Sequence, residues 1–183
     1  MNSMAKIGGT LLAFSAVAAL LLAGTNQMTA PTIEQRNLAA SNQARMQVLP
    51  SAKEFKKIDA SKYKSAGVST VSEVYQGDDG GFTVKAAPGG YGGPVEITIG
   101  IAKDGKITGV AIGNNTETPG LGAKAADPVF NGQYKGKAAK EIKVIKSGTP
   151  KDNEIKAISG ATITSKAVTS GVNEAIKVFD VLK

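Results

Sequence analysis

The segment Ser159–Ser165, with the sequence SGATITS, places hydroxyl groups beside a glycine and just before an amphipathic stretch. The first backbone N–H groups of a helix have no partner within the helix, so a phosphate or a hydroxyl side chain can bind them. Gly160 would also let a ligand approach the backbone closely. Two interpretations stay open from these residues alone: a phosphate-binding site, or Ser and Thr side chains that only cap the helix.

Two further loops have residue types that could line such a site. Glu117–Gly122 reads ETPGLG, and Pro119 followed by Gly120 is typical of a type II turn, which leaves the rest of the hexapeptide unexplained. Pro88–Pro94 reads PGGYGGP. It fits either a solvent-exposed loop or a surface where glycines let a ligand contact Tyr91.

The composition excludes several kinds of chemistry. The 183 residues include no Cys, His or Trp. The chain therefore has no thiolate or imidazole ligands for zinc, haem, copper or an iron–sulfur cluster, and it has no disulfide. We predict no metal site, so any redox chemistry must use an organic cofactor. We also predict no catalytic residues, since a cofactor that does the chemistry needs no general acid, base or nucleophile from the chain.

The chain is basic, with 22 Lys and Arg residues against 15 Asp and Glu and a formal charge of +7. A basic surface can meet anionic lipid, nucleic acid or an acidic protein, but most Lys residues simply keep a surface solvated. The aromatic content is low, and no helix-turn-helix, RNP-like or zinc-finger pattern is present. We therefore predict no nucleic-acid partner.

An apolar segment without charges runs from Ile7 to Gly24. As a helix it would span about 27 Å, close to the hydrocarbon thickness of a bilayer. A cleaved signal peptide is the alternative, because small residues follow the apolar core. We predict a retained transmembrane anchor over residues 1–28, with membrane lipid around it. Lys6 on the short N-terminal side favours a cytoplasmic N-terminus, although Arg36 on the other flank weakens that bias.

Sparse apolar positions between Thr32 and Phe55 suggest a helical stalk over residues 29–60, which Pro50 ends or turns. The globular domain is then predicted over 61–183. Asp78–Gly81 predicts a turn between two strands, Val71–Tyr75 and Phe82–Ala87. The alternation from Val95 to Ile101 predicts a second hairpin, which turns at Lys103–Lys106 into Ile107–Ile112.

Helices are expected in two places after these strands. The clearer one begins near Thr162–Ser165, because Val168, Val172, Ala175, Ile176, Phe179 and Leu182 recur at intervals of three and four. The other candidate is Ala138–Val144. An antiparallel sheet with packed helices predicts an α+β fold.

Two of these motifs resemble those of a known family. SGATIT resembles the flavinylation motif of the FMN-binding domain shared by RnfG and NqrC proteins, and ETPGLG resembles a loop of the same family. The final Thr of the flavinylation motif matches Thr164. The resemblance implies that its hydroxyl is joined to FMN in a phosphoester by a flavin transferase that uses FAD as donor. At Lys156 the chain departs from the family, which commonly has an Asp shortly before the SGAT segment.

The resemblance implies a set of cofactor-binding residues around Thr164. They are Ser159, Gly160, Ala161, Thr162, Glu117, Thr118, Gly120, Leu121, Gly122 and Tyr91. The resemblance covers nearly the whole chain. The compact length of the chain is closer to that of RnfG proteins than to that of NqrC proteins.

An RnfG-like chain would be an electron-transfer subunit of a membrane-bound, ion-translocating ferredoxin:NAD⁺ oxidoreductase. Its partners would be RnfA, RnfB, RnfC, RnfD and RnfE-like subunits, with electrons arriving from an iron–sulfur centre and leaving to a second covalent flavin. The FMN domain would lie on the extracytoplasmic side of a prokaryotic cell membrane. One alternative is an NqrC-like subunit of a Na⁺-translocating NADH:quinone oxidoreductase. Another is an unflavinylated extracytoplasmic assembly module in which SGATIT only caps a helix.

Overall fold

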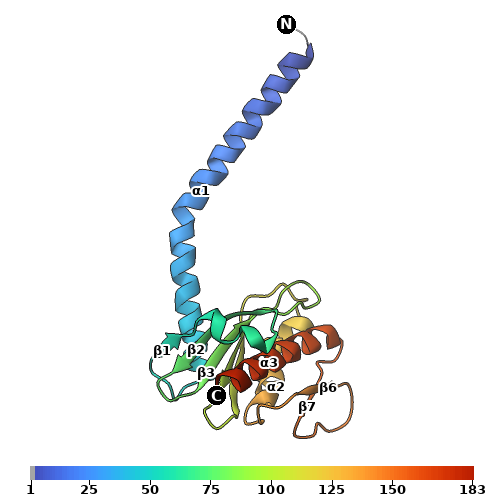
Figure 1. Cartoon of the computed structure of the whole chain (residues 1–183). Coiled ribbons are helices and arrows are strands. Elements are labelled where there is room, and N and C mark those ends of the chain that lie inside the picture. The colour runs from blue at the N-terminus through green and yellow to red at the C-terminus, as the bar shows by residue number, and fades with distance from the viewer. Residues whose placement is uncertain (1–2) are drawn as a thin grey trace. The chain divides into compact units, whose positions relative to one another are not determined.

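The computed structural model describes residues 3–183, and the chain divides into two compact units (Figure 1). The first ends at Asn42, and the second comprises Gln43–Lys183. Helix α1, Ser3–Val48, provides all of the first unit that the structure describes and ends inside the second.

The described residues of the first unit are helical, and this unit contains the apolar segment from Ile7 to Gly24. Helix α1 is long and apolar enough to cross a membrane, and none of its most apolar stretch is buried against other residues of the chain. Its hydroxyl groups bond back to the helix: Thr10 donates to the Lys6 carbonyl oxygen at 2.8 Å, and Thr25 donates to that of Leu21 at 2.8 Å. Such internal bonds satisfy hydroxyl groups that hydrocarbon could not.

The predicted helical stalk is wrong beyond Val48. Pro50 disfavours helical geometry at the residue before it, and α1 ends two residues earlier. Phe55–Lys57 then forms strand β1, which pairs with the next strand. Residues 43–60 belong to the compact globular unit, which therefore begins well before the predicted boundary at residue 61.

A five-stranded antiparallel sheet in the order β1-β2-β3-β4-β5 forms the centre of this unit. The strands after β1 are β2 Val71–Gly77, β3 Phe82–Ala86, β4 Ile97–Ile101 and β5 Ile107–Ile112. Both predicted hairpins are confirmed. Their turns use Gly80 and Gly105, with φ of 82° and 79°, which are backbone angles that favour glycine. Two short 3-10 helices, η1 Ala60–Lys62 and η2 Lys64–Ala66, connect β1 to β2.

Helix α3, Thr162–Leu182, covers one face of the sheet, as its apolar periodicity predicts (Figure 1). Val168, Val172 and Ala175 are fully buried. The ring of Phe179 meets that of Phe82 edge-on at 5.9 Å. At Gly171 the helix comes so close to the sheet that a Cβ atom would collide with Ile97.

The other face of the sheet receives the end of α1. The Thr108 hydroxyl donates to the Val48 carbonyl oxygen, and Gly100 has no side chain where that carbonyl approaches. Arg45 is buried there, 3.7 Å above the ring of Tyr75 and 3.3 Å from the Glu73 carboxylate. These contacts fix the last turn of α1 to the globular unit.

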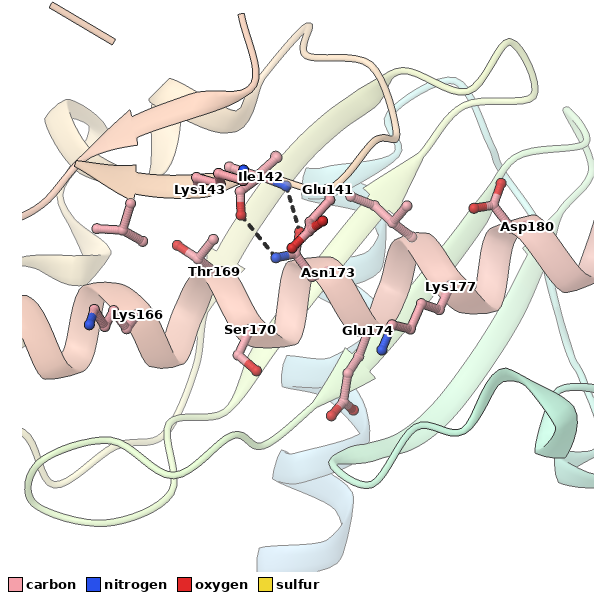
Figure 2. A pocket seen from close by; sticks show the side chains of 12 residues that line it. Glu141, Ile142, Lys143, Lys166, Thr169, Ser170, Asn173, Glu174, Lys177 and Asp180 are labelled. Atoms are coloured by element: carbon pink, nitrogen blue, oxygen red, sulfur yellow. Dashed lines mark hydrogen bonds between the residues drawn. The ribbon is translucent and has the colours of Figure 1, made fainter. Parts of the chain in front are cut away.

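The chain between β5 and α3 holds short elements. They are η3 Gly122–Ala126, α2 Pro128–Asn131, η4 Gly132–Tyr134, and a parallel pair of strands, β6 Lys143–Ile145 and β7 Glu154–Lys156. The predicted helix over Ala138–Val144 is wrong. Ala138 pairs with Lys106, and the Asn173 amide bonds both to the Ile142 N–H and to its carbonyl oxygen, each at 2.9 Å (Figure 2). Backbone groups paired in this way are not free to form helical bonds.

Candidate functional site

Three segments far apart in the sequence line one cavity of about 530 Å³. They are the glycine-rich loop before β4, the loop after β5 and the start of α3. The lining residues are Tyr91, Glu117, Thr118, Leu121, Gly122, Gly160, Ala161, Thr162, Ile163 and Thr164. The structure thus brings together most of the residues that the motifs single out.

Two predicted residues do not line this cavity. Gly120, with φ of 77°, forms the turn in which the Leu121 N–H donates to the Thr118 carbonyl oxygen at 3.1 Å, so the chain geometry of a turn accounts for the glycine there. Ser159 faces a separate cavity of about 340 Å³ with Lys124 and Lys156.

Ile163 lines the cavity but was not predicted. Its side chain is 55% exposed although the residue is large and apolar. The signal was present in the sequence, because Ile163 lies outside the periodic set that forms the buried face of α3.

Thr164 is buried, with 1% of its surface exposed, and its hydroxyl donates to Glu117 Oε2 at 2.5 Å. This bond joins the first turn of α3 to the ETPGLG loop across 47 residues of sequence. The Thr164 oxygen is therefore held in one place at the wall of the cavity.

The Glu117 carboxylate accepts three hydrogen bonds. Besides the Thr164 hydroxyl, the N–H groups of Tyr91 and Gly92 donate to Oε1 at 2.8 and 3.1 Å. Burial opposes ionisation of this carboxyl group, but the bonds from Thr164, Gly92 and Tyr91 outweigh it and hold the pKa of Glu117 below its ordinary value. Glu117 is consequently an ionised, buried carboxylate at neutral pH.

Glycines leave the room that this arrangement needs. A Cβ atom on Gly122 would lie 2.7 Å from Thr164 Oγ1 and 2.9 Å from Glu117 Cβ. A Cβ atom on Gly90 would collide with Glu117 Oε1. Since real Cβ atoms do not approach other atoms so closely, side chains at these positions would displace the carboxylate or the hydroxyl.

The start of α3 has no side-chain cap. Ala161 occupies the N-cap position and Gly160 precedes it with φ of 78°. The Ser165 hydroxyl accepts from the Ile158 N–H at 3.0 Å and donates to the Ala161 carbonyl oxygen at 2.9 Å. The interpretation of these hydroxyl groups as helix caps is thus wrong, and the first N–H groups of α3 remain available to an anion.

Large apolar side chains are exposed around the cavity. Tyr91 is 70% exposed and Leu121 43% exposed, and Ile163 is exposed as well. Apolar and aromatic groups beside an anion-binding helix start suit a ligand that has a flat ring system and a phosphate.

A further groove of about 570 Å³ runs along α3, lined by residues such as Glu141, Lys166, Glu174 and Lys177 (Figure 2). Its charged side chains are of both signs. It contains none of the three motifs, so the cavity at Thr164 is the candidate functional site.

Comparison with known proteins agrees with this choice. Residues 1–48 match the RnfG N-terminal region, and residues 90–177 match the FMN-binding domain. The G subunit of the Na⁺-translocating ferredoxin:NAD⁺ oxidoreductase complex of Acetobacterium woodii is 47% identical over 188 residues, which cover 95% of this chain and 90% of that protein. The chain belongs to the RnfG family.

Other relatives extend this match. The G subunit of the proton-translocating ferredoxin:NAD⁺ oxidoreductase complex of Clostridium ljungdahlii is 34% identical, over 96% of this chain and 91% of that protein. The G subunit of the ion-translocating oxidoreductase complex of Methanosarcina acetivorans is 32% identical, over 96% and 94%. The resemblance that the two motifs carry is therefore confirmed.

Solved structures share the fold of this RnfG-family chain. The C subunit of the Na⁺-translocating NADH-quinone reductase of Parabacteroides distasonis aligns with a TM-score of 0.56 and 24% identity, over 72% of this chain and 79% of that one. NqrC of Shewanella oneidensis aligns with a TM-score of 0.53 and 23% identity, over 60% and 58%. The predicted α+β fold is confirmed.

The cavity residues fit FMN. All three lining segments lie within the FMN-binding domain of residues 90–177. The uncapped start of α3 suits the phosphate, the exposed apolar side chains suit the ring system, and the volume is in the range of ordinary cofactor sites.

Proposed function

We propose that this chain carries FMN in a phosphoester with Thr164 and serves as the electron-transferring G subunit of an ion-translocating ferredoxin:NAD⁺ oxidoreductase. One observation carries the proposal: the Thr164 hydroxyl lies at the wall of the FMN-domain cavity, at a helix start that no side chain caps. A phosphate on Thr164 Oγ1 would lie beside N–H groups that otherwise have no partner in the helix.

The residues of the predicted set take distinct roles in this proposal. Gly160 and Ala161 turn the chain into α3, and the free N–H groups that would face the phosphate begin at Thr162. Tyr91, Thr118 and Leu121 line the side of the cavity where the ring system would lie, and Gly122 keeps space free between the two loops. Ser159 and Gly120 shape the turns on either side of the cavity and do not contact the cofactor.

The bound flavin supplies reversible electron transfer, and the protein holds it, tunes its potential and limits its contact with solvent species. The carboxyl group of Glu117 lies in the wall of the cavity and is one of the groups that would set the electrostatic environment of the flavin. Attachment through Thr164 prevents loss of the cofactor into a compartment where free FMN is scarce.

The other subunits of such a complex are the proposed partners. RnfA, RnfB, RnfC, RnfD and RnfE-like proteins would receive and supply electrons and would carry the ion pathway. The apolar part of α1 would hold the chain in the membrane with the N-terminus in the cytoplasm and the FMN domain outside. A flavin transferase would attach the cofactor.

The two alternative functions have less support. An NqrC-like role has weaker support, since the relatives at 32 to 47% identity are G subunits of ion-translocating complexes and the NqrC likeness concerns the fold alone. An unflavinylated assembly module in which SGATIT only caps a helix also has weaker support, because no side chain caps the start of α3.

A Thr164→Ala variant tests the proposal. We expect the native full-length chain to fluoresce as a denatured band in a gel, and Thr164→Ala to abolish that fluorescence, because the ester oxygen is gone. Ser170→Ala, which removes an exposed hydroxyl from the same helix outside the cavity, is the matched control and should keep the flavin. A flavin that stays covalently bound to the Thr164→Ala chain would refute the assignment.

A further inference from the structure

The hydrogen bond from Thr164 to Glu117 has the geometry of a nucleophile paired with a general base. Thr164 Oγ1 donates to Glu117 Oε2 at 2.5 Å, and Glu117 is 6% exposed. A neutral alcohol is a weak nucleophile, and an adjacent base that accepts its proton is the usual means of activating it.

We propose that Glu117 is a catalytic residue in the modification of this chain: it takes the proton of the Thr164 hydroxyl while Oγ1 bonds to the flavin phosphate. This inference rests on the proposed attachment of FMN to Thr164. It goes further because it assigns the base to the chain that is modified.

The carboxylate is positioned for this role before any flavin arrives. The N–H groups of Tyr91 and Gly92 hold Oε1, which leaves Oε2 directed at Thr164. Gly90 and Gly122 lack the side chains that would push the carboxylate away. Because the position is fixed in advance, little reorganisation is needed when the proton moves.

The step balances in atoms and charge with a flavin adenine dinucleotide as co-reactant. Thr164 Oγ1 forms a bond to the flavin-side phosphorus, the bond from that phosphorus to the bridging oxygen breaks, and AMP leaves with the electron pair. The Thr164 proton moves to Glu117 Oε2. An ionised carboxylate and a hydroxyl become a carboxylic acid and a phosphodiester, and no electrons are gained or lost.

After FMN is attached, the proton stays on Glu117. Esterified Thr164 can no longer donate a hydrogen bond, and the phosphodiester adds a negative charge beside the carboxyl group. Both changes raise the pKa of Glu117 relative to the unmodified chain. A protonated Glu117 can donate to a phosphate oxygen, which replaces the lost bond.

Few groups face Glu117, so the pH dependence of the attachment rate can be assigned to its carboxyl group. They are the Thr164 hydroxyl, the N–H groups of Tyr91 and Gly92, and the backbone of Gly90 and Gly122. Within residues 3–183, none of the ion pairs includes Glu117. The Tyr91 side chain is 70% exposed, and it is the Tyr91 backbone N–H that bonds to Glu117.

The test uses the full-length chain in detergent, FAD and the flavin transferase of the native host, with covalent flavin followed by intact mass over time. Glu117→Gln keeps the size of the side chain and an oxygen for the two N–H groups but cannot take a proton. We expect attachment to slow by about 10² to 10⁴-fold. Glu96→Gln, which neutralises a carboxylate paired with Lys85, is the control and should match the wild type.

The ratio of wild-type to Glu117→Gln rates, measured across pH, separates proton transfer from a structural role and cancels the transferase's own titrations. It should fall towards one as the pH drops through the pKa of Glu117. Equal rates, or a large ratio that persists at a pH below the pKa of Glu117, would overturn the base assignment. A wild-type chain that gains no flavin at all would instead refute the attachment to Thr164.

Discussion

Gly122 lies against both the Glu117 carboxylate and the Thr164 hydroxyl. A Cβ atom there would lie 2.7 Å from Thr164 Oγ1. We expect Gly122→Ala to reduce covalent flavin by about tenfold or more, since a shift of about 1 Å in a reacting group costs rate steeply. Fluorescence of the denatured chain, normalised to protein, measures this.

Gly132→Ala is the matched control for Gly122→Ala. Gly132 has φ of −65°, and a Cβ atom there would meet no atom within 4 Å. It should carry the wild-type amount of flavin. Full loading of Gly122→Ala would mean that the contact between Glu117 and Thr164 is not needed for attachment.

The residues of the site could be predicted from the two motifs, but their contacts could not. SGATIT and ETPGLG indicated Thr164 and Glu117 separately. Nothing in the sequence joins the two, because their bond depends on how α3 and the loop after β5 fold against each other. The turn at Gly120 was predictable from local chemistry, and the periodicity of α3 already placed Ile163 off its buried face; that Ile163 lines the cavity depends on the fold.

Glu174 joins elements that lie far apart in the sequence. Its carboxylate accepts from the Thr70 N–H and hydroxyl at 2.9 and 2.8 Å and from the Ser69 hydroxyl at 3.2 Å, so α3 holds the chain just before β2. Burial opposes its ionisation, but these bonds outweigh that effect and lower the pKa of Glu174. The carboxylate therefore stabilises the fold above the pKa of an unfolded Glu, near about 4.3, and loses this effect as pH falls through its lower folded pKa.

We expect Glu174→Gln to lower the free energy of unfolding by about 1 kcal/mol at pH 7, because one acceptor is lost. The difference from wild type should shrink as the pH falls through the folded pKa. Urea unfolding followed by tyrosine fluorescence measures both. Glu141→Gln, which changes an exposed carboxylate in the same groove (Figure 2), is the control. A difference that grows in acid would contradict the expected sign.

Elements with a strong local pattern were predictable, and those fixed by distant contacts were not. Apolar and polar residues alternate around β4, which predicts a strand, and apolar residues recur every three or four positions in α3, which predicts a helix. Residues 138–144 have no such pattern, and their conformation follows from Lys106, Asn173 and strand β7. The end of α1 near Pro50 was predictable, whereas the packing of Arg45 and Val48 against the sheet was not.

The molecule has two units: one whose described residues are all in α1, with an apolar stretch that is exposed, and a globular unit that has its own core. Insertion of this stretch into a membrane would remove its exposed apolar side chains from water. We expect the full chain to fractionate with membranes. Since the chain has no Cys, single cysteines at Ser3 and Ser147 can report the side on which each unit lies.

In spheroplasts, a membrane-impermeant maleimide should label Ser147→Cys and should label Ser3→Cys only after permeabilisation. Ser147 lies on an exposed loop between β6 and β7. Retained fluorescence of the flavin in both variants controls for folding. The reverse labelling pattern would place the FMN domain in the cytoplasm and contradict the proposed topology.

The most direct test of the central claim is peptide mapping of the chain isolated from its native membrane. Digestion and tandem mass spectrometry should find one peptide heavier by FMN less one water, with fragment ions that place the added mass on Thr164. An unmodified Thr164 in the native complex, or flavin on another residue, would contradict the account.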